Sequence, residues 1–227
     1  MGILEVTDVQ RTFGGIVALD SVSLSITQGE TTVIIGANGA GKTTLFNCIT
    51  GYHTPDEGSV VFDGADITQT PDYKVARMGI RRTFQEVDVF DELTVAENIS
   101  LGVFRSDPRE LMEALDLMEI NDKLGEELTL FERKRVALAL AADGKLLLLD
   151  EVFSGLDPAE KPAMLDHLNI LAEEKTLMLI EHDIETAFDL ADNVIVLSQG
   201  RVLGQGTPEE VKNDEEVQEQ YLGEMAL

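Results

Sequence analysis

A glycine-rich segment near the N-terminus has the composition and spacing of a phosphate-binding loop. It matches the pattern GxxxxGK[ST], and it lies between a short β-branched run and a segment of helical character. The glycines let successive backbone N–H groups point at phosphate oxygens, and the start of the following helix adds a favourable partial charge. Lys42 would reach the β- and γ-phosphates, and the Thr43 hydroxyl would ligate Mg²⁺. The candidate loop consists of Gly36, Ala37, Asn38, Gly39, Ala40, Gly41, Lys42, Thr43 and Thr44.

A pair of carboxylates, Asp150 and Glu151, ends an apolar run over residues 146–149. A buried strand would deliver both side chains to its carboxyl end, where open α/β sheets bind their ligands. Asp150 would hold the Mg²⁺ shell, and Glu151 would orient or deprotonate the attacking water. Together with the phosphate-binding loop, this pair predicts phosphoryl-transfer chemistry on a nucleotide.

The elements that must position these residues alternate along the chain. Apolar and polar residues alternate over 3–9 and 22–26, which predicts antiparallel strands with one face in water. Residues 31–35, 146–149 and 176–180 are short apolar runs without alternation, as in parallel strands buried on both faces. Residues 86–142 between them are rich in helix formers, and helices are expected over 109–120 and 133–142. The pattern favours an α/β fold with an added β layer and a helical insertion.

Composition narrows the possible partners. With 17 basic and 43 acidic residues, the net charge of −26 would repel a phosphate backbone, so no nucleic-acid partner is expected. No apolar run approaches the ~20 residues that a membrane span needs, so we expect a soluble chain that reaches a membrane only through a partner. The single cysteine, Cys48, excludes an internal disulfide framework. The acidity also suggests adaptation to a high-salt cytosol, which a melting temperature that does not rise towards molar salt would contradict.

The order of the motifs resembles the nucleotide-binding subunit of ABC transporters. The phosphate-binding loop is followed by Thr83-Phe84-Gln85, the Asp150-Glu151 pair, Ser154-Gly155-Leu156-Asp157 and Glu181-His182-Asp183. More narrowly, the chain is similar to the ATPases of branched-chain amino acid importers over about residues 3–224. That narrower likeness rests on Phe13-Gly14-Gly15, Arg82-Thr83-Phe84-Gln85, Ile180-Glu181-His182 and Gly206-Thr207-Pro208-Glu209-Glu210.

The resemblance implies further site residues. Phe13 stands where the family stacks an aromatic ring on adenine, although a lone Phe before two glycines is also a candidate core residue. Gln85 matches the glutamine that touches Mg²⁺ and senses the γ-phosphate, and His182 matches the switch histidine at the γ-phosphate. Asp157 matches the loop through which two such domains touch. The family therefore implies ATP and Mg²⁺, a second ATP-binding subunit and transmembrane permease subunits.

The signature segment departs from the family pattern. A second copy of the domain normally closes over ATP with an LSGGQ-like segment, and the aligned residues here are Leu128, Thr129, Leu130, Phe131 and Glu132. Thr129 keeps a hydroxyl and Glu132 could replace the glutamine, but both glycines are gone, and bulky side chains hinder close approach of backbone to phosphate. This is either variation within the family or a sign of weakened hydrolysis.

We therefore expect a P-loop NTPase fold of the ABC type, with a mixed parallel core sheet, an N-terminal antiparallel β subdomain and a helical subdomain at about 86–142 inserted in a RecA-like core. Residues 1–227 would form one ATP-binding domain at the cytoplasmic face of the cell membrane. It would power an importer of branched-chain or other hydrophobic amino acids. The alternatives are a weakened regulatory partner, or the same ATPase serving urea, amides or a lipid-linked export substrate. The basic clusters at 77–82 and 133–135 either balance helix charge or form a docking patch for the permease.

Overall fold

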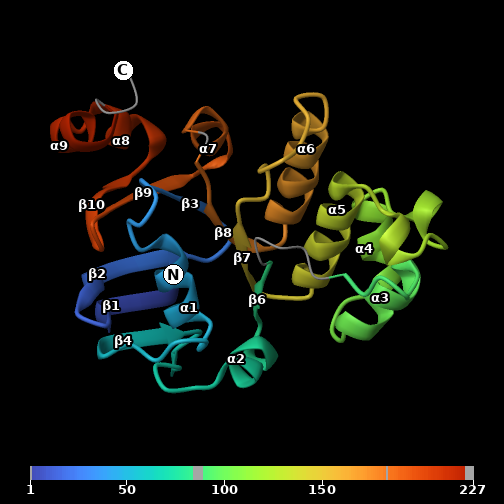
Figure 1. Ribbon diagram of the computed structural model, residues 1–227, viewed down its shortest axis with the longest axis horizontal. Coiled ribbons are helices and arrows are strands. Elements are labelled where there is room, and N and C mark those ends of the chain that lie inside the picture. The colour runs from blue at the N-terminus through green and yellow to red at the C-terminus, as the bar shows by residue number, and fades with distance from the viewer. Residues whose placement is uncertain (1, 84–88, 183, 223–227) are drawn as a thin grey trace.

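The chain is arranged around a six-stranded sheet (Figure 1), and the computed structural model describes residues 2–83, 89–182 and 184–222. The strands of this sheet are β3 (Thr31–Ile35), β6 (Ile80–Arg82), β7 (Leu146–Asp150), β8 (Thr176–Ile180), β9 (Asn193–Ser198) and β10 (Arg201–Gly206). Their order is β10-β9-β3-β8-β7-β6. The pairs from β9 to β6 are parallel, and β10 pairs antiparallel with β9. The carboxyl ends of β3, β7 and β8 therefore share one edge of the sheet.

The three expected buried strands are confirmed, because every residue of β3, β7 and β8 is buried. Successive side chains of a strand point to opposite faces. Val33, Leu147 and Leu149 join one apolar cluster with helix residues, whereas Ile34 and Leu148 join another with the N-terminal strands. The core sheet is thus covered on both faces, which explains why these runs lack polar alternation.

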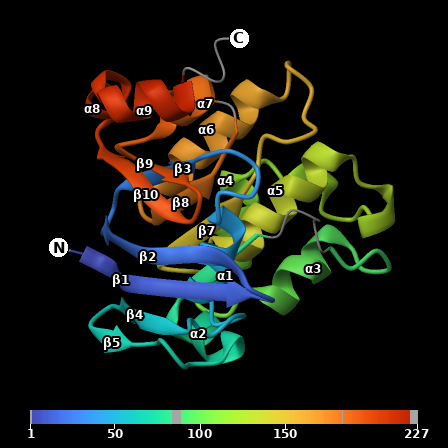
Figure 2. The same ribbon diagram turned by 60° about the vertical axis from the view of Figure 1, so that its left-hand side comes forward.

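An antiparallel sheet packs on one of these faces, as the alternating N-terminal sequence predicts. Its strands are β1 (Gly2–Phe13), β2 (Ile16–Thr27), β4 (Glu57–Phe62) and β5 (Ala65–Asp66), in the order β2-β1-β4-β5. Helix α1 (Lys42–Ile49) contributes Leu45, Phe46 and Ile49 to the same apolar cluster. Figure 2 shows β1 and β2 running side by side, with β4 beyond β1. Helix α2 (Asp72–Met78) leads into β6.

The chain between β6 and β7 is helical and lies at one end of the molecule (Figure 1). It contains α3 (Val95–Gly102), α4 (Pro108–Ala114), 3₁₀ turns at Met118–Ile120 and Gly125–Glu127, and α5 (Leu130–Ala141). The helix expected over 109–120 is shorter than predicted, because Asp116 adopts a left-handed φ of 53° that an α-helix does not accommodate. The helix expected at 133–142 begins earlier, at Leu130, because Thr129 caps its N-terminus.

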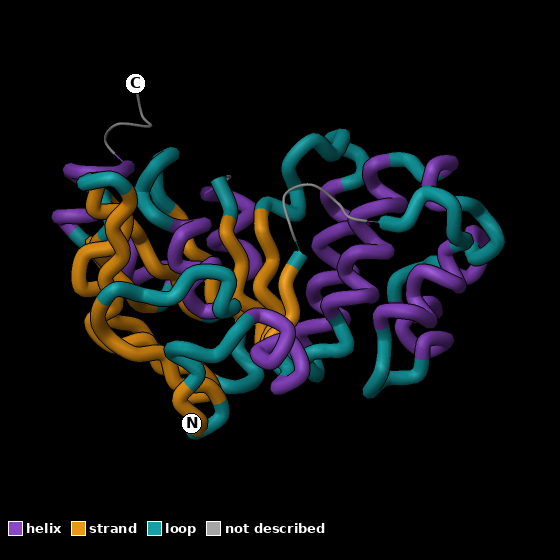
Figure 3. The backbone as a smooth tube through the Cα atoms, turned by 60° about the horizontal axis from the view of Figure 1, so that its bottom comes forward, coloured by secondary structure: helices purple, strands orange, loops and turns teal. Residues whose placement is uncertain are grey.

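The remaining helices follow β7 and the later strands. They are α6 (Lys161–Ala172), α7 (Ile184–Leu190), α8 (Pro208–Asn213), α9 (Glu215–Val217) and a π-helical turn at Gln218–Leu222. Figure 3 shows the core strands between the N-terminal β layer and the helical end of the molecule. Within the described ranges, no helix has the length and apolar character needed to cross a lipid bilayer.

Candidate nucleotide-binding site

The phosphate-binding loop joins the end of β3 to the start of α1. Gly41 has a φ of 104°, and a Cβ atom there would lie 2.5 Å from the carbonyl oxygen of Ala18, so only glycine fits. Gly39 also has a left-handed φ, of 81°, but a Cβ atom on it would meet nothing within 4 Å, so this side of the loop is open. Over the described residues, no side chain caps the N-terminus of α1. Its first backbone N–H groups therefore remain available to an anion.

Lys42 lies folded under this loop. Its Nζ donates hydrogen bonds to the carbonyl oxygens of Gly36 at 2.6 Å and Ala37 at 3.1 Å. Burial lowers the pKa of Lys42, while the charges of Glu151 and Asp150 act in the opposite direction. The ammonium group is held next to the open side of the loop, where a phosphate would be its natural acceptor.

Asp150 ends β7 as a buried carboxylate. Arg82 of β6 donates to its Oδ2 at 2.9 Å, and the same guanidinium donates to Oδ1 of Asn47 in α1 at 2.5 Å. Burial raises the pKa of Asp150, and Arg82 opposes that shift. The sequence did not predict this ion pair with Arg82. It holds the Asp150 carboxylate beside β6, the strand that ends shortly before residue 85.

Carboxylate and hydroxyl oxygens are ligands that Mg²⁺ accepts, and Mg²⁺ commonly keeps water and substrate phosphates in the rest of its shell. Asp150 and the exposed Thr43 supply such oxygens at neighbouring ends of β7 and α1. Among the described residues, no group of three or more His, Cys, Asp and Glu side chains could hold a metal ion. The oxygen donors of Thr43 and Asp150 fit a magnesium ion whose remaining ligands would be water and nucleotide phosphates. Gln85, the other expected ligand, lies outside the described residues.

Glu151 follows Asp150 in an unusual backbone conformation. Its φ of 52° lies in the left-handed region, which costs a non-glycine residue about 1–2 kcal/mol. Its Oε1 lies 2.8 Å from Nε2 of His182, so the two side chains that the motifs predict as catalytic are brought together. Its carbonyl oxygen accepts a hydrogen bond from Nζ of Lys134 in α5 at 3.0 Å. Strain of this kind persists only where the surrounding structure holds it in place.

One cavity brings residues 38–44 of the phosphate-binding loop together with Glu151 and His182, whereas Asp150 is not among its lining residues. It has a volume of about 320 Å³ and is lined by Ile16, Val17, Ala18, Asn38, Gly39, Ala40, Gly41, Lys42, Thr43, Thr44, Glu151 and His182. Residues 16–18 form a wall that the sequence did not single out, and Ile16 is 74% exposed. Phe13 does not line the cavity. Its ring is 38% exposed, which argues against a core role, and it packs edge-on against His53 with Arg11 over one face.

The signature segment begins α5, away from this cavity. The Thr129 hydroxyl accepts from the N–H of Glu132, and the Glu132 carboxylate accepts from the N–H of Thr129, forming a capping box. Partial burial opposes ionisation of Glu132, but hydrogen bonds from Lys123 and Thr129 outweigh it and lower its pKa. The Leu130 side chain is 43% exposed. Phe131 turns inward, where its ring stacks on His167 and carries Arg135 on its face.

The site has the features of a phosphate-loop nucleotide hydrolase. These are a loop of left-handed glycines, an uncapped helix start, a buried lysine and paired carboxylates. Comparison with known families narrows this class. Residues 19–154 match the family described as ABC transporter, and residues 201–226 match the one described as branched-chain amino acid ATP-binding cassette transporter. The chain therefore belongs to the ABC transporter family, as an ATPase of that family.

Individual relatives and solved structures agree with this assignment. The chain is 34% identical to the high-affinity branched-chain amino acid transport ATP-binding protein BraF of Pseudomonas aeruginosa, with 98% of each protein covered. It is also 34% identical to the lipopolysaccharide export system ATP-binding protein LptB of Haemophilus influenzae, over 99% of this chain and 98% of that protein. A nucleotide-free ATP-binding cassette from an ABC transporter superposes with a TM-score of 0.87 at 31% identity, covering 97% and 99% of the two chains. A dimeric cassette bound to ADP and Pi superposes with a TM-score of 0.78 at 27% identity, covering 90% and 98%. The expected α/β fold of the ABC type is thereby confirmed.

Proposed function

We propose that this chain hydrolyses Mg²⁺-ATP to power an importer of branched-chain or other hydrophobic amino acids, with residues 1–227 acting as one ATP-binding domain that carries a helical insertion at about 86–142. The observation that carries the proposal is a cavity in which the phosphate-binding loop faces Glu151 and His182. The loop follows β3, Glu151 follows β7 and His182 lies just after β8, and these three strands are distant in sequence but adjacent in the sheet.

Each side chain has a defined task in this proposal. Backbone N–H groups of residues 36–44 hold the phosphates, and Lys42 exchanges its carbonyl acceptors for phosphate oxygens. Glu151 accepts a proton from water, and His182 stabilises charge on the phosphoryl group. Thr43, Asp150 and Gln85 would hold Mg²⁺, which when bound would supply positive charge to the phosphates. Phe13, which lies outside the lining of this cavity, would contribute an aromatic face for adenine.

A second ATP-binding subunit, identical or related, completes the site. The N-terminus of α5 is exposed at Thr129 and Leu130 and does not reach the cavity of its own chain. In a closed dimer, Thr129 and Glu132 would face the ATP held by the other subunit, and Asp157 would lie at the contact. The similarity to a dimeric cassette bound to ADP and Pi supports this arrangement.

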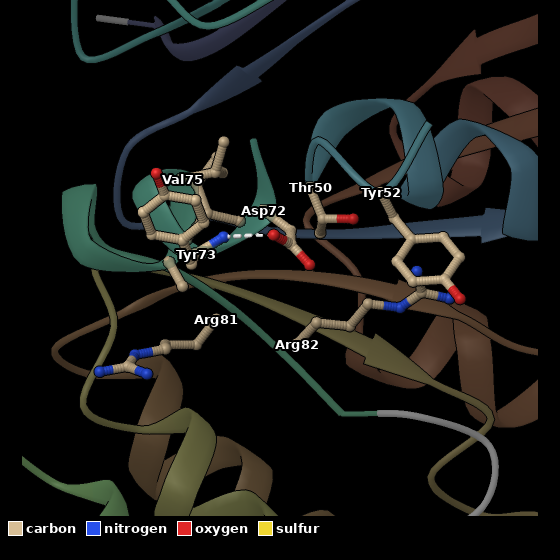
Figure 4. A pocket seen from close by; sticks show the side chains of 9 residues that line it. Thr50, Tyr52, Asp72, Tyr73, Val75, Arg81 and Arg82 are labelled. Atoms are coloured by element: carbon tan, nitrogen blue, oxygen red, sulfur yellow. Dashed lines mark hydrogen bonds between the residues drawn. The ribbon is translucent and has the colours of Figure 1, made fainter. Parts of the chain in front are cut away.

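We propose that the permease docks at a hollow beside β6, and the chain would then be a peripheral subunit at the cytoplasmic face of the cell membrane. A cavity of about 240 Å³ is lined there by Thr50, Tyr52, Asp72, Tyr73, Val75, Ala76, Ile80, Arg81 and Arg82. Figure 4 shows the rings of Tyr52 and Tyr73 on opposite sides of it, with Arg81 and Arg82 extending from β6. Tyr52 and Tyr73 are 64% and 56% exposed, as suits an apolar partner helix.

Three arginines of the basic clusters at 77–82 and 133–135 form ion pairs within the chain, so we do not assign them to permease docking. Arg81 pairs with Asp143 at 3.0 Å, Arg82 with Asp150 at 2.9 Å, and Arg133 with Asp91 at 2.6 Å. Charge balance within the chain accounts for these three arginines. Tyrosines, rather than a positive patch, are therefore the groups that we propose for permease recognition.

The cargo proposal draws on the match of residues 201–226 and on the likeness to BraF. The likeness to LptB keeps a lipid-linked export substrate as the main alternative, beside urea and amides. Reconstitution of this chain with its permease and binding protein in liposomes, with labelled leucine or urea, tests the proposal. ATP-dependent uptake of leucine supports it, and ATP-dependent uptake of urea alone would reassign the cargo.

A weakened regulatory subunit is the second candidate, favoured by the side chains at Leu130 and Phe131. Because Phe131 is turned inward against His167, only Leu130 of the two remains in the path of an approaching nucleotide. Hydrolysis by the purified chain alone supports the full ATPase. Hydrolysis only in the presence of a second ATPase chain would support the regulatory subunit.

A further inference from the structure

A buried lysine in α5 contacts the turn that carries Glu151. Lys134 is 7% exposed, and its Nζ donates to the carbonyl oxygen of Glu151 at 3.0 Å. It lies one helical turn and a half beyond Thr129, on the same rigid helix. Lysine is rarely buried unless it is paired, so this contact calls for an explanation that packing alone does not give.

A buried carboxylate completes the arrangement from the end of the neighbouring strand β8. Glu181 follows β8 directly, precedes His182 and is 3% exposed. Its Oε1 accepts the N–H of Phe153 at 3.5 Å, and the N–H of Val152 also contributes. Burial raises the pKa of Glu181 to about 7, while the charge of Lys134 acts to lower it. Burial likewise lowers the pKa of Lys134, opposed first by Glu181 and then by Glu151.

These two residues hold the backbone around Glu151 from two sides. The carbonyl oxygen of Glu151 accepts from Lys134 and from the N–H of Ser154 at 3.1 Å. The N–H of Glu151 donates to Ile180 at 2.9 Å, and Glu181 binds the next turn of chain. The left-handed φ of Glu151 is thus maintained by contacts from α5 and from β8.

We propose that Lys134 and Glu181 are positioning residues that join α5 to the catalytic turn and hold the Glu151 carboxylate of the same chain in its working position. The inference rests on the proposed function, in which Glu151 activates water. Its consequence is specific: Lys134 and Glu181 act on the ATP site of their own chain.

Substitutions at Lys134 distinguish a role in positioning Glu151 from a role in the stability of the fold. Lys134→Met keeps the aliphatic stem and removes the donor, Lys134→Arg keeps donor and charge, and Lys145→Met removes an exposed lysine as a control. We expect Lys134→Met to lower kcat by about 100-fold, the effect of a small displacement of a catalytic group, with ATP affinity unchanged. Lys134→Arg should recover most of the activity. A parallel loss of kcat, ATP affinity and melting temperature would show a merely structural role and overturn the proposal.

Mixed dimers test whether Lys134 acts on the site of its own chain. One subunit carries Glu151→Gln, so that only the other subunit can hydrolyse ATP, and Lys134→Met is placed in one subunit or the other. The proposal predicts that the substitution lowers turnover by about 100-fold when it shares a chain with the intact Glu151 and spares turnover when it lies in the other chain. Equal effects in both positions would overturn it. If Lys134→Met does not fold, the near-isosteric Glu181→Gln carries the same comparison.

Failure of the proposed function would be recognised separately. If wild-type dimers do not hydrolyse ATP, or if Glu151→Gln in both subunits leaves turnover intact, the assignment of Glu151 is wrong whatever Lys134 does. If wild type hydrolyses ATP and Glu151→Gln does not, while Lys134→Met behaves as wild type, only the positioning inference is refuted.

Discussion

Replacing Asp143 tests how the helical insertion is joined to the core sheet. The Asp143 side chain is fully buried in the turn before β7, where Arg81 donates to it at 3.0 Å. It also accepts the backbone N–H groups of Phe104, Arg105 and Ser106 at 3.1, 2.7 and 2.9 Å. Hydrogen bonds to a charged group contribute about 1.5–3 kcal/mol each, and removing one partner of a buried ion pair costs about 3–5 kcal/mol. Because these contributions share one carboxylate and do not add, we expect Asp143→Ala to lower the free energy of unfolding by about 3–5 kcal/mol.

For a chain of this size, that loss lowers the melting temperature by roughly 10 °C. Lys145→Ala is the matched control, since Lys145 pairs with Asp63 at 2.7 Å but its side chain is 54% exposed, and such surface pairs contribute about 0–1 kcal/mol. Burial alone would raise the pKa of Asp143, but the backbone N–H groups and Arg81 lower it overall. Its stabilisation is therefore present above the pKa of the unfolded chain and lost as pH falls through the folded-state pKa. Equal melting shifts for the two variants, measured by differential scanning calorimetry, would refute this reasoning.

Three further outcomes are expected. Lys42→Ala should weaken ATP binding by about tenfold to a hundredfold in calorimetric titration, through loss of charge-assisted hydrogen bonds, and an unchanged affinity would remove Lys42 from the phosphate site. Glu132→Gln keeps the hydrogen-bond acceptor for the N–H of Thr129 but removes a negative charge from the α5 N-terminus. The ATP-dependent dimer should therefore have a lower dissociation constant in sedimentation experiments. A higher dissociation constant would argue that the charge is needed. The folded-state pKa of Glu181 is about 7, above its ordinary value of 4.5. Protonation of this carboxyl therefore stabilises the folded chain fully below about pH 4.5, and that contribution is lost as pH rises to about 7. Denaturant titrations of Glu181→Gln should show a flatter dependence of unfolding free energy over that interval, and an unchanged slope would place the titration elsewhere.

The sequence predicted those parts of the site that depend on short-range spacing. A phosphate-binding loop is a local structure, so the glycine pattern between residues 36 and 44 and the helix start after it were enough to place Lys42 and Thr43. Likewise, runs without polar alternation required burial on both faces, and this placed Asp150 and Glu151 at the carboxyl edge of a parallel sheet.

Contacts between distant elements were not predictable in the same way. Lys134 belongs to a basic run that is typical of a solvated helix surface, yet it is buried, and its Nζ contacts the carbonyl oxygen of Glu151, 17 residues further along the chain. Asp143 stands in a turn to which no sequence motif draws attention, yet its carboxylate binds three backbone N–H groups about forty residues away in the sequence. The helix expected to reach residue 120 ends early because Asp116 takes a left-handed conformation, for which a single aspartate is a weak signal. Such features are decided by tertiary structure rather than by local pattern.

Steady-state hydrolysis of Mg²⁺-ATP by wild type and Glu151→Gln, compared across low to molar salt, tests the central claim most directly. Glu185→Gln, which alters an exposed carboxylate in α7, serves as the control. We predict turnover by wild type and by the control, and none by Glu151→Gln, which should still bind ATP because the phosphate-binding loop and Lys42 are intact. Normal turnover in Glu151→Gln would contradict the assignment of Glu151 as the group that activates water.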